Sequence, residues 1–78
     1  TMATLQVDGG RKQKVRPGDI VGALTGKDGI AATEVGKINV FERCTYVAVT
    51  QTKAKAALKK LSEGKLKGRS FRVRRIRG

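Results

Sequence analysis

Two groups of positively charged side chains have the residue types and spacing that suggest a chemical role. Residues 11–16 carry four cations directly after the glycines of Asp8-Gly9-Gly10, and residues 69–77 carry five arginines. Lysine binds phosphate as a point charge, whereas arginine forms bidentate phosphate contacts and stacks on bases. The first group also fits a solvated turn. Glycines permit close approach of a ligand, however, so the density of charge beside them favours phosphate contact.

A third group alternates along residues 37–49, KINVFERCTYVAV, which have the period-two pattern of two short strands joined near Glu42-Arg43. The inner face of this pair is predicted to carry Ile38, Val40, Thr45, Val47 and Val49. The outer face is predicted to carry Lys37, Asn39, Phe41, Cys44 and Tyr46. Since the outer face holds two of the chain's three aromatic residues, a bound base is expected to stack there.

The composition of the 78-residue chain narrows the class of partner. Eighteen Lys and Arg against six Asp and Glu give a net charge of +12, which indicates nucleic acid first and an anionic membrane second. No apolar run approaches the roughly 20 residues of a membrane span, and no secretory segment is present. The leading prediction therefore includes nucleic acid and no membrane partner. The single cysteine fits a reducing, cytoplasmic setting, and the absence of histidine disfavours zinc and triad chemistry.

Four further segments must position these groups. Residues 3–7 form a predicted strand, and a short helix is predicted from Pro17 to a stop at Gly26, with Gly22 packed tightly against a sheet. Residues 27–36 look irregular. A second helix is predicted over 52–63, because Ala54, Ala57, Leu58 and Leu61 recur with helical period.

The lysines of that second helix fit a solvated face better than a binding site. The final strand is predicted over 69–77, with Phe71 and Val73 inward and Arg72 and Arg74 outward. Arg75 breaks the alternation, so the strand is expected to end or bulge there.

The predicted order is strand, helix, strand, strand, helix, strand. This is the split βαβ, ferredoxin-like arrangement of the α+β class, with a four-stranded antiparallel sheet and two helices on one face. We expect one domain over residues 1–78. An open sheet face in a strongly basic domain indicates an RRM-like binder of single-stranded or loop RNA.

The chain also resembles a known family. ERCTYVAV (residues 42–49) lies where an RRM has its RNP1 motif, and Leu5-Gln6-Val7 lies where RNP2 belongs. Gln6, Glu42 and Cys44 depart from those motifs, so Tyr46 is the one stacking residue left. DGGRKQKVRPGDIVGALTG (8–26) and EVGKINVFERCTYVAV (34–49) closely resemble the C-terminal RNA-binding domain of DbpA/YxiN-type bacterial DEAD-box RNA helicases.

This resemblance implies a degenerate RRM that tethers an ATP-dependent helicase to a hairpin of 23S ribosomal RNA at the peptidyl transferase centre, for assembly of the large ribosomal subunit. The chain has no GxxxxGK[ST] loop and no Asp-Glu-Ala-Asp box, so no enzymatic activity or cofactor is expected of it. ATP and Mg²⁺ would serve the parent helicase, whose core would be the partner in cis. Thr1 before Met2 suggests an excised domain, expected to be a monomer.

The predicted RNA contacts divide by role. Phosphate contacts from the first loop are assigned to Lys12, Lys14 and Arg16. Lys37 and Asn39 would bind phosphate and base edges, and Tyr46 would stack. Phe41 would either pack on a base or cover its neighbour. Four further contacts, which would clamp the backbone or stack, are Arg69, Arg72, Arg74 and Arg75.

Two alternatives stay open. One is an RRM-like protein-interaction module that has lost RNA binding, which the net charge of +12 disfavours. The other is a nonspecific tether to DNA or anionic membrane.

Overall fold

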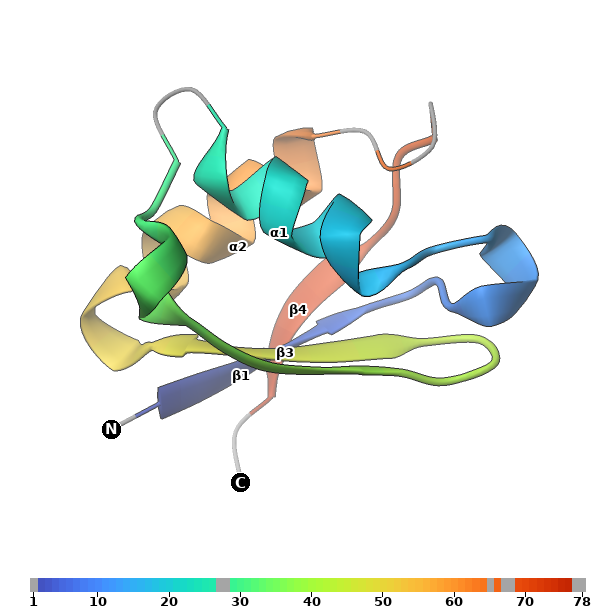
Figure 1. The fold of residues 1–78 in the computed structure, drawn as a ribbon, viewed down its shortest axis with the longest axis horizontal. Coiled ribbons are helices and arrows are strands. Elements are labelled where there is room, and N and C mark those ends of the chain that lie inside the picture. The colour runs from blue at the N-terminus through green and yellow to red at the C-terminus, as the bar shows by residue number, and fades with distance from the viewer. Residues whose placement is uncertain (1, 27–28, 65, 67–68, 77–78) are drawn as a thin grey trace.

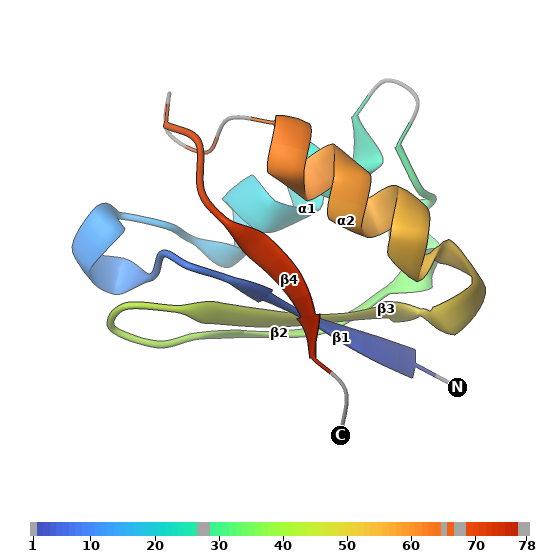
Figure 2. The same cartoon turned by 180° about the vertical axis from the view of Figure 1, so that it is seen from behind.

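The computed structural model describes residues 2–26, 29–64, 66 and 69–76. These residues form two layers, a four-stranded antiparallel sheet with two helices on one face (Figures 1 and 2). The predicted fold class and order of elements are therefore confirmed. The strands are β1 (Met2–Val7), β2 (Val35–Val40), β3 (Thr45–Thr50) and β4 (Val73–Ile76), in the spatial order β2-β3-β1-β4. The helices are α1 (Pro17–Thr25) and α2 (Ala54–Glu63).

Alternation along the strands fills the core from the sheet side, as predicted. Leu5 and Val7 of β1 and Val47 and Val49 of β3 are fully buried. The helices supply Ile20, Leu24, Ala54, Ala57 and Leu61. Because the fully buried apolar side chains of the strands lie on one face of the sheet, the helices cover that face and the other remains open.

Three short 3₁₀ turns connect these elements: η1 (Arg11–Gln13), η2 (Ala32–Glu34) and η3 (Gln51–Lys53). The turn η3 explains why α2 begins at Ala54, two residues after the predicted start of the helix at Thr52.

Gly22 does not pack against the sheet, and this prediction was wrong. The residue is exposed, and a methyl group added to it would meet no atom within 4 Å. At about 100° per residue, Gly22 lies roughly 200° around the helix from Ile20, which is on the buried face. The sequence signal came from the residue type alone and carried no information about its side of the helix.

The last strand differs from its prediction in length and at Arg75. Its sheet pairing covers Val73–Ile76 rather than 69–77, and Arg77 lies outside the described residues. Arg69 instead exchanges two backbone hydrogen bonds with Leu66, of 2.8 and 3.0 Å. Arg75 does not end the strand, because it continues the regular register opposite Leu5. The break in hydrophobic alternation reflects the edge position of β4, where an inward-facing residue can stay exposed.

Candidate nucleic-acid interface

One row of polar side chains crosses the helix-free face of all four strands. Asn39 of β2 lies opposite Tyr46 of β3, which lies opposite Gln6 of β1, which lies opposite Arg74 of β4. Directly opposed residues in antiparallel strands share one face of the sheet. Tyr46 and Gln6 neighbour the buried Thr45 and Val7 along their strands, so this shared face is the one opposite the core. We call these four residues the central row.

An aromatic pair stands beside the central row. The rings of Phe41 and Tyr46 meet edge to face, with centroids 5.6 Å apart and an angle of 76° between planes. Phe41 is 49% exposed, so one part of its surface covers Tyr46 while another part remains accessible to a ligand. Of the two roles considered for Phe41, cover of its neighbour is present in the structure. Tyr46 is consequently less isolated than the motif comparison indicated.

Side-chain hydrogen bonds orient the central row. Arg74 donates from Nε and Nη2 to Oε1 of Gln6, at 3.3 and 3.1 Å. A hydrogen bond with the Cys44 thiol raises the pKa of the Tyr46 hydroxyl, while the positive charge of Arg74 acts in the opposite direction. At neutral pH the Tyr46 side chain is therefore uncharged. It can stack on a base and does not repel a neighbouring phosphate.

The first basic loop is fixed to the tip of the β2–β3 hairpin. The backbone amides of Arg11 and Lys12 donate to the carbonyl oxygens of Phe41 and Glu42, at 2.8 and 2.9 Å. Lys12 also forms an exposed ion pair with Glu42, with Nζ 3.8 Å from Oε1. These contacts join the basic loop to the aromatic end of the open face.

Gly10 serves this attachment and Gly9 makes room for the Phe71 ring, which overturns the expectation that the two glycines allow a ligand to approach. A Cβ on Gly10 would overlap the carbonyl oxygen of Phe41 and lie 2.7 Å from the amide nitrogen of Cys44. A Cβ on Gly9 would lie 2.6 Å from the ring of Phe71. Both glycines are buried by the protein's own chain.

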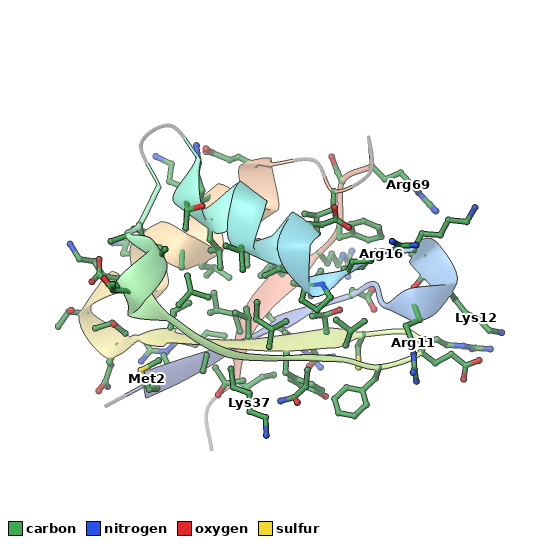
Figure 3. The ribbon with its side chains drawn as sticks, in the orientation of Figure 1. Met2, Arg11, Lys12, Arg16, Lys37 and Arg69 are labelled. Atoms are coloured by element: carbon green, nitrogen blue, oxygen red, sulfur yellow. The ribbon has the colours of Figure 1, made fainter. Side chains whose placement is uncertain are left out.

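The predicted site residues divide between two sides of the sheet. Lys37 projects from the helix-free face, and Lys12 lies at the hairpin end (Figure 3). Arg72 and Arg74 are exposed, and their alternation with Val73 places both on the helix-free side. Lys14 is exposed at the end of η1, where its φ of 64° is in the left-handed region.

Arg16, Arg69 and Arg75 lie on the side of the helices. Arg16 precedes α1, and its backbone amide donates to Oδ2 of Asp19 at 3.0 Å. The Arg69 guanidinium lies 5.7 Å from the centroid of the Phe71 ring, and Figure 3 shows Arg16 and Arg69 at the level of the helix layer. Arg75 shares the face of Leu5. The four arginines that were predicted to clamp the backbone or stack therefore do not share one face of the sheet.

Arg11 belongs to the basic loop but was not among the residues predicted to contact RNA. Its side chain extends from η1 away from the helix layer (Figure 3). The positive charge of Arg11 was visible in the sequence. The direction of its side chain was not, because that direction depends on the contact between η1 and the distant hairpin, which the local sequence pattern does not encode.

The described residues contain no cluster of three or more His, Cys, Asp or Glu side chains able to hold a metal ion. None of the helices described here is long and apolar enough to cross a membrane.

Comparison with known proteins identifies the family. A family model described as the DbpA RNA-binding domain matches residues 4–75. The chain is 51% identical over 76 residues to the ATP-dependent RNA helicase DbpA of Escherichia coli (strain K12), covering 97% of the chain and 17% of that protein. It is 32% identical over 69 residues to the ATP-dependent RNA helicase DbpA of Bacillus subtilis (strain 168), covering 88% of the chain and 14% of that protein.

A third relative is the ATP-dependent RNA helicase DeaD of Mycobacterium tuberculosis (strain ATCC 25618 / H37Rv). It is 30% identical over 67 residues, which are 86% of the chain and 12% of that protein. The chain thus spans a small fraction of the length of each relative.

Proposed function

Because the chain belongs to the DbpA RNA-binding domain family, we propose that it binds a hairpin of 23S ribosomal RNA near the peptidyl transferase centre. In this proposal it directs a DEAD-box helicase core, joined in cis, to the assembling large ribosomal subunit. The domain acts as a monomer in the cytoplasm. ATP and Mg²⁺ serve the helicase core, because the chain itself carries no phosphate-binding loop.

The observation that carries the proposal is the combination of the family match with a cationic open face. The net charge is +12, and Lys37, Arg72 and Arg74 belong to the sheet face that the helices leave uncovered. Arg11 and Lys12 add charge at the hairpin end of the sheet. Folded RNA with an exposed loop fits this arrangement, because it offers phosphates to the rim and unstacked bases to the sheet.

Each contact then has a distinct task. Lys12 and Lys14, with Arg11, hold phosphates at the loop end, which sets the position of the RNA without reading its sequence. Asn39 hydrogen-bonds a base edge, Lys37 binds phosphate, and the Phe41–Tyr46 pair stacks a base. Arg72 and Arg74 contact the RNA along β4. RNA passing round the edge to the helix side would meet Arg16, Arg69 and Arg75.

A competition titration tests this function. The chain is titrated with a fluorescent 23S hairpin fragment, and the complex is challenged with a scrambled hairpin and with unrelated duplex DNA. We expect the unlabelled authentic hairpin to displace the fluorescent one at a concentration at least tenfold lower than the scrambled hairpin or the duplex DNA requires. This is a modest specificity ratio for nucleic acid. Equal competition by duplex DNA would instead indicate a nonspecific tether. Absence of binding at low salt would indicate a protein-interaction module.

A further inference from the structure

A hollow lies between β1 and β4, at the β4 edge of the sheet. Its volume is about 380 Å³, and it is lined by Gln6, Asp8, Arg72, Val73 and Arg74. Four of these five residues are polar or charged. The hollow adjoins the central row, which ends in Gln6 and Arg74.

Cross-strand pairing fixes the arrangement of the four polar side chains. Gln6 lies opposite Arg74, and two residues further along β1 the amide of Asp8 donates to the carbonyl oxygen of Arg72 at 2.8 Å. Residues two apart on a strand share a face, so all four side chains lie on the helix-free side. The hollow thus has an amide and a carboxylate along one wall and two guanidinium groups along the other.

The hydrogen bonds within the hollow leave a defined set of donors and acceptors. Arg74 donates to the side-chain oxygen Oε1 of Gln6. This contact orients the side-chain NH₂ group of Gln6, which remains available as a donor. Neither the Asp8 carboxylate nor the Arg72 guanidinium has a side-chain hydrogen bond or ion pair to any residue that the structure describes. The hollow therefore offers an acceptor pair on Asp8 and donors on Arg72.

An acidic side chain in this hollow favours a ligand group other than phosphate at this point. The chain has three times as many cationic as acidic residues, and a carboxylate beside the RNA backbone would repel it. Two adjacent N–H donors on a base would instead be attracted by the two oxygens of Asp8, in a charge-assisted bidentate contact.

Among the four bases, guanine has the complementary edge. Its N1–H and N2–H₂ groups are adjacent donors for a carboxylate, and its O6 and N7 are the acceptors that arginine binds. Adenine and cytosine place an acceptor nitrogen beside their amino group, and uracil has a single N–H between two carbonyl oxygens. Each of these three bases would face Asp8 with at least one acceptor.

We propose that the hollow between β1 and β4 is a guanine-binding subsite, in which Asp8 accepts from N1–H and N2–H₂ while Arg72 donates to O6. This inference rests on the proposed function, because it names a base that the bound RNA presents in an unpaired segment. Gln6, which lacks the aromatic ring of the RNP2 motif, serves here to hold Arg74 at the wall of the subsite.

The test uses short oligouridines with one central guanosine, inosine or adenosine, titrated into the wild type and into Asp8→Asn. Inosine lacks only the N2 amino group of guanosine. We expect guanosine to bind the wild type about tenfold more tightly than inosine or adenosine, the usual scale of one good bidentate contact. In Asp8→Asn the guanosine–inosine difference should fall below about twofold.

Glu63→Gln is the matched control, because it removes one negative charge at the end of α2, away from the hollow. It should keep the full preference for guanosine.

An equal guanosine–inosine ratio in the wild type and Asp8→Asn would overturn the subsite, as would a wild type without preference. Failure of the 23S hairpin to bind the wild type would overturn the proposed function, whereas retained hairpin binding with unchanged base preference in Asp8→Asn would overturn the subsite alone. Thermal melts of both variants confirm that they fold.

Discussion

At the scale of single residues, the centre of the open face is polar with a small aromatic contribution. Its central row of Asn39, Tyr46, Gln6 and Arg74 contains one ring, which Phe41 meets at its edge. A typical RRM stacks two or three bases on such a face, whereas here Gln6 makes a hydrogen bond to Arg74 in place of a stack. We therefore expect stacking to supply less of the binding free energy and charged contacts to supply more.

This balance predicts the order of two variants. Tyr46→Ala should weaken hairpin binding by roughly 1 kcal/mol, the lower end of the stacking range, because the edge-on Phe41 ring remains. Lys12→Ala combined with Lys14→Ala should weaken binding more, since it removes two phosphate contacts. Fluorescence titration at low salt compares the two. Tyr46→Phe is the control that keeps the ring. Abolished binding in Tyr46→Ala with an unaffected double lysine variant would contradict the assignment.

Tyr46 also offers a direct test of its surroundings, because it is the only tyrosine in the chain. The hydrogen bond with Cys44 raises the pKa of Tyr46, so Cys44→Ala should lower the pH at which phenolate absorbance develops. The folded chain holds this proton more tightly than the unfolded chain. Its contribution to stability is therefore fully present below the ordinary tyrosine pKa and is lost as pH rises through the raised value. An unchanged midpoint in Cys44→Ala would refute the contact.

At the scale of elements, contacts between distant segments place the site. The 3₁₀ turn η1 is attached to the β2–β3 hairpin by two backbone hydrogen bonds. Gly10 lets the two backbones come close enough to form them. Helix α1, in contrast, contains Gly22 at an exposed position without steric need. Glycine at these two positions therefore has opposite consequences for stability.

Gly22→Ala should stabilise the domain by about 0.5–1 kcal/mol, because alanine loses less conformational entropy in a helix and meets no atom here. Gly10→Ala should destabilise it by about 1–3 kcal/mol, since its Cβ would overlap the hairpin backbone. Urea denaturation of both variants measures the difference. A destabilised Gly22→Ala would show that α1 packs more tightly at this position than the structure indicates.

The sequence predicted the helices and strands better than the contacts and register between them. Alternation placed Leu5, Val7, Val47 and Val49 in the core and Tyr46 on the open face, because strand period is a local property. The sides of Arg75 and Arg16 could not be predicted, since they depend on the register of β4 and on the entry into α1. The role of Gly9 and Gly10 was likewise hidden, because their neighbours are Phe71, Phe41 and Cys44, far along the chain.

At the scale of the whole molecule, charge dominates the expected energetics. Neutralising about six phosphates of single-stranded RNA should give a slope of about −4 when the logarithm of the association constant is plotted against that of the salt concentration. Removing Lys12 and Lys14 should make this slope shallower by about 1.4. Titrations across a salt series measure both slopes. An affinity independent of salt would contradict the electrostatic account.

The central claim is that RNA binds the helix-free face and its basic loop. NMR chemical-shift mapping with the 23S hairpin tests it most directly, because backbone amides report the two faces separately in one experiment. We predict the largest shifts at Lys12, Lys37, Tyr46 and Arg74. Shifts should be small at Lys55 and Lys59 on the exposed side of α2. Shifts concentrated along α2, with the central row unaffected, would contradict it.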